Sequence, residues 1–226
     1  MDNQSVVSLS GSLPVGRHLR CYCGQNHWDF PNRKASGPTK YLIRCGAPSE
    51  TLPHVLNHCR ISSAAWTKRH DAVLERIRKA VAFRGRILSQ NKTVGSTGLR
   101  PDLVAEIDGK IFIIDVTIPF DNRLQAFEVA RKTKIEKYQP LIPVFRAMGH
   151  QEVQIIPIVV GSLGAWDVTN DQFLKIVATK SYLALLRKLC VSDSIRWSRD
   201  IYTEHMTGHR QYENEARDSV PQDNLM

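Results

Sequence analysis

A hairpin pattern in the middle of the chain constrains the fold more than any other feature. Residues 103–107 form a short β-prone run that ends at Asp108-Gly109, a dipeptide typical of tight hairpin turns. Residues 110–118 then form a nearly continuous apolar run, which predicts a strand buried on both faces. The pattern therefore predicts an antiparallel strand pair inside a core.

Two aspartates fall at the open end of this hairpin. Asp102 precedes the first strand and Asp115 lies near the end of the second, so antiparallel pairing places them side by side. Asp115 and Thr117 share a face because side chains alternate along a strand. Either aspartate alone also fits a cap or turn residue, whereas the pair favours a site for a hard divalent cation. Such a cation acidifies water and orients a phosphodiester, so the pair points to a metal-dependent nuclease.

A lysine-bearing helix is predicted after the hairpin, over residues 123–141, which contain no glycine. At 100° per residue, one stripe of this helix faces inward. The stripe consists of Leu124, Phe127, Arg131, Lys134, Ile135 and Tyr138. Lys132 and Glu136 point away. A lysine on an inward stripe needs a partner or a task, so Lys134 is the first candidate for the site and Lys137 the second. The alternative is that Lys134 extends its ammonium group to solvent.

These motifs resemble a known family. Arg100-Pro101-Asp102, Asp115-Val116-Thr117 and Lys134 with Lys137-Tyr138 look like the restriction-like endonuclease domain of site-specific non-LTR retrotransposon polyproteins. The resemblance runs from Cys45 to Val160 and implies an α/β fold, with a PD-(D/E)xK core built on a mixed sheet. In most of that wider superfamily the lysine lies two residues after the second acid, where this chain has Thr117. In the retrotransposon branch the helix supplies the lysine, which matches Lys134.

The resemblance also implies roles for these residues. Asp102 and Asp115, with the carbonyl of Val116, would bind Mg²⁺ or Mn²⁺. Lys134 would orient the attacking water or stabilise the charge that develops on phosphorus. Supporting or DNA-facing positions would be Thr117, Lys137 and Tyr138, of which the tyrosine equally fits core packing. The implied activity is nicking of double-stranded target DNA, which primes reverse transcription in the nucleus.

The sequence also fits a second function. The chain has no room for the reverse transcriptase that normally precedes such a domain, so it also fits a catalytically inactive nucleic-acid-binding fragment of a decayed polyprotein. Intact Asp102, Asp115 and Lys134 favour activity, whereas altered cysteine spacing favours decay. The expected partners are double-stranded DNA and, within a longer polyprotein, element RNA and the reverse transcriptase region.

A second candidate site lies upstream of the hairpin. Thr51 can cap a short helix that carries His54 and His58 one turn apart, with Cys59 just beyond. Structural zinc binds four nitrogen or sulfur ligands in a closed tetrahedron. With Cys45, this stretch resembles the CCHC zinc element that precedes the nuclease in the same family. Structural Zn²⁺ is therefore the expected ion, and free reduced thiols are the alternative.

The fourth zinc ligand is less defined. The family has two cysteines close together, but Leu42 and Ile43 occupy those positions here. Cys21, Cys23 or His58 can complete the site, and the predicted ligand set is Cys23, Cys45, His54 and Cys59. An odd number of cysteines, 5, clustered with histidine argues against a disulfide framework and for a reducing compartment.

Basic charge is concentrated in the first part of the chain. Residues 1–100 contain 16 Lys and Arg against 5 Asp and Glu, whereas residues 101–226 contain 15 against 17. A predicted amphipathic helix over residues 66–83 carries part of this excess, and basic side chains give a salt-sensitive grip on phosphate. The predicted nucleic-acid contacts are Lys68, Arg69, His70 and Arg131. For His70, a contact with the DNA backbone or a structural hydrogen bond is favoured over a role as catalytic base.

The remaining patterns define three regions. Residues 1–62 form a basic segment with the zinc element, residues 63–206 the nuclease domain, and residues 207–226 a polar tail expected to be disordered. Further strands are expected at 86–88 and 153–160, the latter at an edge or with a bulge because of Pro157. Further helices are expected at 171–178, 182–191 and 194–205. No signal peptide and no apolar stretch of membrane-spanning length is found.

Overall fold

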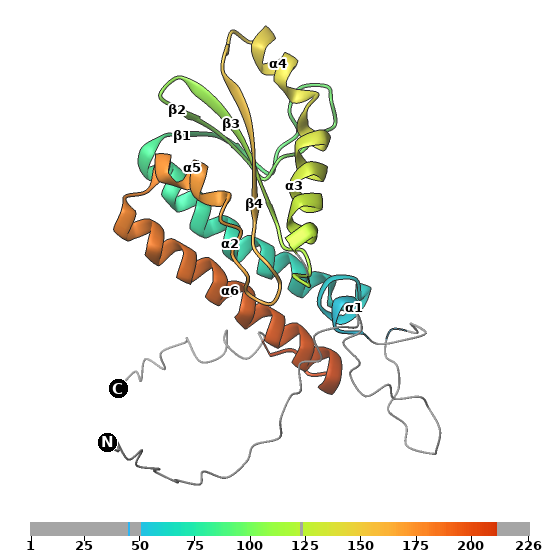
Figure 1. The fold of residues 1–226 in the computed structure, drawn as a ribbon. Helices are drawn as coiled ribbons and strands as arrows, with labels where there is room; N and C mark the ends of the chain where they lie inside the picture. The colour runs from blue at the N-terminus through green and yellow to red at the C-terminus, as the bar shows by residue number, and fades with distance from the viewer. Residues whose placement is uncertain (1–44, 46–50, 123, 212–226) are drawn as a thin grey trace, which may run out of the picture.

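The computed structural model describes Cys45 and residues 51–122 and 124–211, with the Leu124 side chain left out. Four strands form one mixed sheet in the order β1-β2-β3-β4 (Figure 1). The strands are β1 (Arg86–Gln90), β2 (Leu103–Ile107), β3 (Lys110–Thr117) and β4 (Val153–Val159). β1, β2 and β3 pair antiparallel, and β4 runs parallel to β3. The predicted α/β fold with a mixed sheet is confirmed.

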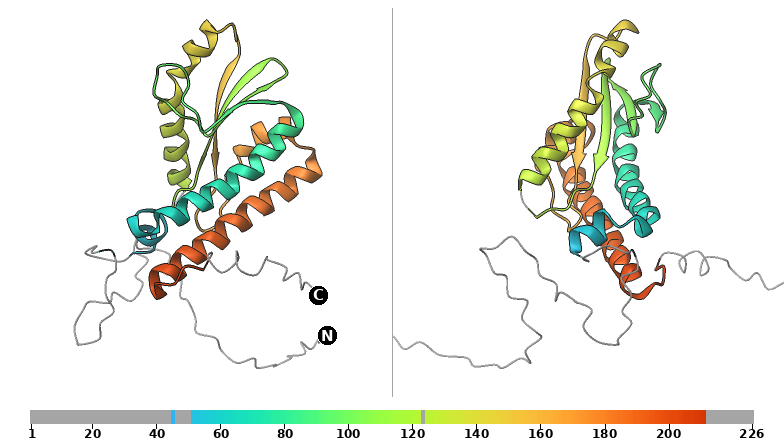
Figure 2. Two further views of the ribbon diagram at one scale, coloured as in Figure 1. Left: turned by 180° about the vertical axis from the view of Figure 1, so that it is seen from behind. Right: turned by 90° about the vertical axis from the view of Figure 1, so that its right-hand side faces the viewer.

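Helices cover both faces of this sheet. They are α1 (Leu52–Asn57), η1 (Arg60–Ser62), α2 (Ser63–Arg84), α3 (Leu124–Tyr138), α4 (Leu141–Ala147), α5 (Asn170–Val177) and α6 (Lys180–Thr207). α2 and α6 run side by side and, with α5, pack on one face (Figures 1 and 2). α3 and α4 pack on the opposite face. α1 forms a small separate core with the ends of α2 and α6.

The predicted hairpin is present and positions the aspartates. Asp108 and Gly109 both adopt positive φ, 49° and 77°, as a two-residue primed turn requires. Leu103 pairs with Ile114, so Asp102 and Asp115 follow at the same end of the two strands. β3 is buried on both faces, as predicted, because alternate side chains enter the two opposite cores.

Two helical predictions need correction. The helix predicted over residues 123–141 ends at Tyr138, and a separate helix, α4, follows it. Pro140 is the N-cap of α4 and Pro143 lies in its first turn, where proline is tolerated. The helices expected at 182–191 and 194–205 are one continuous helix, α6. The polar residues between them do not break it: Asp193 accepts a hydrogen bond from Arg76, and Ser194 donates one to the carbonyl of Gly161.

Other predictions differ less. On α3, Phe127 and Tyr138 are buried as expected, but Ile135 is 40% exposed, which corrects the predicted inward stripe. β4 is an edge strand, in agreement with Pro157. Most of the tail predicted to be disordered, residues 212–226, lies outside the described residues. No helix among the described residues combines the length and apolar character needed to cross a membrane.

Candidate active site

Asp102 lies at the end of the sheet between α2 and the last residues of β3. Its Oδ2 accepts a hydrogen bond from the backbone N–H of Val116 at 2.8 Å and contacts Nε2 of His70 at 2.9 Å. No hydrogen bond reaches its Oδ1 from the described residues, and 14% of the side chain is exposed. One carboxylate oxygen is therefore held in place while the other remains open to a ligand.

Asp115 lies deeper and is held from α3. Its Oδ1 accepts a hydrogen bond from the Tyr138 hydroxyl at 2.5 Å, and its Oδ2 pairs with the Lys134 ammonium at 2.5 Å. The Asp115 side chain is 2% exposed. A buried carboxylate without a cation nearby would be strongly unfavourable, so Lys134 offsets its desolvation.

The register of α3 explains why both partners reach Asp115. Lys134 and Tyr138 are four residues apart and so lie one above the other on the same helix face. Asp115 points to this face because it alternates in phase with Ile111 and Ile113, which enter the core beneath α3 and α4. Burial, together with the hydrogen bond to Asp115, raises the pKa of the Tyr138 hydroxyl, which therefore stays protonated as a donor. Tyr138 is thus both a core residue and a site residue.

His70 is a site contact that the sequence did not place here. α2 brings its ring between two carboxylates, with Nε2 at 2.9 Å from Asp102 and Nδ1 at 3.0 Å from Asp71. Burial alone would lower the pKa of His70, but the hydrogen bonds and charges of these two aspartates outweigh it and raise the pKa to about 9. A structural hydrogen bond was one of the two roles favoured for His70, although its partner was unknown. Only its second contact, with the neighbouring Asp71, had a signal in the local sequence.

The raised pKa predicts a pH-dependent contribution of His70 to the stability of the ion-free protein. Because the folded pKa exceeds the unfolded one, the contribution is complete below about pH 6.5 and is lost as the pH rises through about 9. In EDTA, we expect His70→Ala to reduce the free energy of unfolding by about 1–3 kcal/mol at pH 6 and by much less at pH 9.5. Denaturant titrations at both pH values measure this difference. A pH-independent difference would contradict the ion pair.

The predicted nucleic-acid contacts on α2 and α3 differ in exposure: Lys68 is exposed, whereas Arg69 and Arg131 have partners inside the fold. Lys68 is exposed, with its ammonium 5.8 Å from the centroid of the Trp197 ring. Arg69 is 3% exposed and donates hydrogen bonds to the Leu56 carbonyl and the Ser198 hydroxyl. Burial lowers its pKa to about 10, against the charge of Asp121. The prediction that Arg69 contacts DNA is therefore corrected: its guanidinium is used inside the fold.

Arg131 also has an internal partner. Its guanidinium pairs with Asp167, whose side chain is 4% exposed. Asp167 further accepts hydrogen bonds from the backbone and the hydroxyl of Thr169 just before α5. Arg131 therefore links α3 to the loop after β4, and a DNA contact at this residue would have to compete with that pair.

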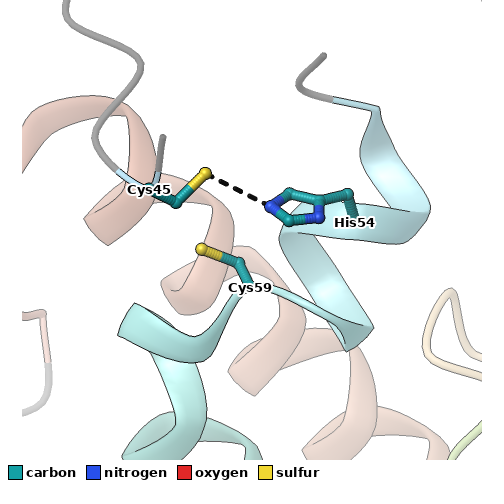
Figure 3. A group of neighbouring side chains, drawn as sticks. All are labelled: Cys45, His54 and Cys59. Carbon is teal, nitrogen blue, oxygen red and sulfur yellow. Dashed lines mark hydrogen bonds between the residues drawn. The ribbon is translucent and has the colours of Figure 1, made fainter. Parts of the chain in front are cut away.

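The Cys-His cluster of Cys45, His54 and Cys59 lies at α1 (Figure 3). The Sγ of Cys45 lies 3.3 Å from Nε2 of His54, and these atoms and the Sγ of Cys59 all lie within 4.8 Å of one another. Thr51 caps α1 as predicted by accepting a hydrogen bond from the His54 N–H. His58 is the C-cap of α1 and is exposed. The candidate ligands Cys21 and Cys23 lie outside the described residues.

The spacing and burial of this cluster suit a metal. Zn–S bonds of 2.3 Å and Zn–N bonds near 2.0 Å place tetrahedral donors roughly 3.5 Å apart. Cys59 is fully buried, as expected for a ligand in a closed structural site. α1 is in turn tied to the rest of the fold, because Asn57 donates a hydrogen bond to the Ile118 carbonyl at the end of β3. The cluster could therefore anchor α1 beside the strand that carries Asp115.

The fold and the site define an α/β domain with a paired-carboxylate centre, in which each acid is held by a cation from a different helix. No protein-family model matches the chain. The chain is 24% identical over 177 residues to the Retrovirus-related Pol polyprotein from type-1 retrotransposable element R2 of Popillia japonica, a match that covers 75% of this chain and 36% of the relative. The chain thus corresponds to about a third of that polyprotein. A solved structure described as a phenuivirid cap-snatching endonuclease aligns with a TM-score of 0.37 and 16% identity, covering 70% of this chain and 68% of the other.

Proposed function

We propose that the chain is the metal-dependent endonuclease domain of a non-LTR retrotransposon polyprotein and that it nicks double-stranded DNA. The proposal rests chiefly on one observation. Two carboxylates, Asp102 and Asp115, lie beside each other across a hairpin, and Lys134 reaches one of them from a separate helix. The similarity to a retrotransposon polyprotein supports this assignment.

The residues at the centre fit a magnesium-type cation. Such ions take oxygen ligands, use one or two protein carboxylates and keep several waters. Asp102 offers the Oδ1 that no described residue occupies. Val116 offers its carbonyl. The N–H of Val116 donates to Asp102, and a strand residue directs its N–H and C=O to the same side, so the carbonyl also faces the acid centre. The next carbonyl, of Thr117, points the opposite way and accepts a hydrogen bond from Val160.

The metal ion and the side chains around it would have separate roles in cleavage. When bound, Mg²⁺ or Mn²⁺ would acidify a water and stabilise the leaving oxygen. Lys134 would turn from Asp115 to the phosphate and stabilise the negative charge that develops there. Tyr138 would keep Asp115 oriented once the lysine has turned. His70 would hold Asp102 from the opposite side, so both acids would be positioned before the DNA arrives.

A plasmid nicking assay tests this function. We expect the purified chain to convert supercoiled plasmid to open circles with Mg²⁺ or Mn²⁺ and to stop when EDTA is added. Asp102→Ala should abolish nicking and leave salt-sensitive DNA binding intact. Equal nicking by both proteins would show that the activity comes from another site or from a contaminant.

We further propose that Cys45, His54 and Cys59 bind a structural zinc ion, with the fourth ligand supplied by Cys23, Cys21 or His58. The thiol and imidazole donors are the types that zinc prefers, and the short contacts among them support the proposal. Zinc would stabilise the attachment of α1 to the domain, since a three-helix contact of this size buries few apolar side chains.

Metal analysis tests the zinc proposal. We expect about one zinc per chain in protein purified without chelator, as for a closed structural site. Cys45→Ser and His54→Gln should each lose most of it. Cys190→Ala is the matched control, since Cys190 is a buried cysteine in α6 outside the cluster. Zinc content that stays unchanged in the two cluster variants would refute the site.

The alternative function is a nucleic-acid-binding fragment without cleavage. It predicts DNA binding but no metal-dependent nicking under any condition. The nuclease function is favoured because Asp102, Asp115 and Lys134 are all present and in contact with partners that orient them. In the full polyprotein, the nick would prime reverse transcription in the nucleus, and element RNA and the reverse transcriptase region would be its partners.

A further inference from the structure

Five cations on the sheet edges and outer helix faces are paired with acids. Each has a carboxylate oxygen within 4.0 Å. The pairs are Lys79–Glu75, Arg84–Asp108, Arg86–Glu106, Lys110–Glu152 and Lys132–Glu136. A cation beside a carboxylate attracts a phosphate weakly because the two charges largely cancel. These surfaces are poor candidates for binding DNA.

Two cations near the acid centre differ from this pattern. Arg100 and Lys137 are both exposed. Within residues 51–122 and 124–211, neither side chain pairs with a carboxylate. Their charges are therefore not cancelled by any acid in the described part of the chain. Two uncompensated positive charges beside a pair of acids that would bind a cation form a surface suited to a polyanion.

Both residues are fixed to the same site residue, Tyr138. The Tyr138 hydroxyl, which contacts Asp115 at 2.5 Å, also lies 3.1 Å from the backbone carbonyl of Arg100. The Lys137 ammonium lies 4.7 Å from the centroid of the Tyr138 ring. Arg100 also stands two residues before Asp102. The buried tyrosine thus anchors the backbone of one cation and the ammonium group of the other next to the carboxylates.

We propose that Arg100 and Lys137 together bind a DNA phosphate next to the one that is cut, and so set the path of the strand through the site. The proposal rests on the proposed nuclease function and adds to it a substrate-binding position. It assigns Lys137 to substrate binding, in place of a direct role in the chemistry. Contacts of this type fix the register of the DNA without reading its sequence.

The salt dependence of DNA binding tests this position. Each cation that neutralises a phosphate of duplex DNA contributes about 0.9 to the slope of log K against log salt concentration. We expect Arg100→Gln and Lys137→Met each to reduce the slope by about 0.9, and the double variant by about twice that. Fluorescence anisotropy with a short labelled duplex in EDTA measures the slope without cleavage. Arg100→Lys, which keeps the charge, should restore it.

Matched controls come from the paired cations. Lys132→Met changes the same residue type on the same helix, but that lysine pairs with Glu136, so its slope should equal that of the wild type. An unchanged slope in the double variant, or an equal loss in Lys132→Met, would overturn the proposal. The two proposals can also fail separately. If the wild type nicks DNA but the double variant has an unchanged slope, the phosphate site is rejected and the nuclease function stands. The expected slope changes in a protein that never nicks would support the phosphate site and reject the nuclease.

Discussion

Asp115→Asn is expected to lower the rate of metal-dependent nicking on the order of a thousand-fold. The substitution keeps the shape of the side chain and its hydrogen bond from Tyr138, but it removes the charge that pairs with Lys134 and that would bind the cation. The initial rate of plasmid nicking at saturating Mg²⁺ measures the effect.

Asp108→Asn provides the control for this change. Asp108 is exposed at the tip of the hairpin, and asparagine tolerates its φ of 49°. Its nicking rate should match that of the wild type. Because Asp115 is buried, near-UV circular dichroism should confirm that the Asp115 variant is folded, and Asp102→Asn gives a second, more exposed test. Near-wild-type nicking by both folded variants would exclude the acid pair as the centre of the chemistry.

Arg69→Met is expected to destabilise the fold by about 2–4 kcal/mol, because each buried acceptor left without its donor costs about 1–3 kcal/mol. Arg69 donates to the Leu56 carbonyl in α1 and to the Ser198 hydroxyl in α6, so it joins three helices. Methionine fills a similar space but donates no hydrogen bond. Denaturant unfolding followed by circular dichroism measures the loss.

Arg60→Met is the matched control for Arg69, since Arg60 is exposed and close in the chain. It should change the free energy of unfolding by less than about 0.5 kcal/mol. If Arg69→Met were as stable as the wild type but bound DNA with a smaller salt dependence, the original prediction that Arg69 contacts DNA would be restored.

The hairpin and its acids could be predicted from the sequence because their signals are local. The Asp-Gly turn fixes the register between β2 and β3, and the register alone places Asp102 beside Asp115. The inward direction of Lys134 followed from helix periodicity. The outward position of Lys132, whose side chain is 77% exposed, followed in the same way. For Ile135 the same periodicity failed, since its side chain is 40% exposed.

The parts that could not be predicted depend on distant segments. Arg69 lies in a basic run that looks like a solvent-facing surface, but its guanidinium is held inside the fold by Leu56 and by Ser198, which is 129 residues away. His70 required the crossing of α2 over the start of β2, which no local pattern encodes. Asp193 and Ser194 looked like a helix break, yet their bonds to Arg76 and Gly161 keep α6 continuous.

Binding of Mn²⁺ to zinc-loaded protein, followed by calorimetry, tests most directly whether the two carboxylates share one ion. The wild type should bind Mn²⁺, and the double variant Asp102→Ala/Asp115→Ala should lose at least about tenfold in affinity, or 1.4 kcal/mol. Asp108→Asn, whose side chain tolerates the positive φ at this position, should bind as the wild type does. Equal Mn²⁺ affinity in the wild type and a folded double variant would contradict the proposed metal centre.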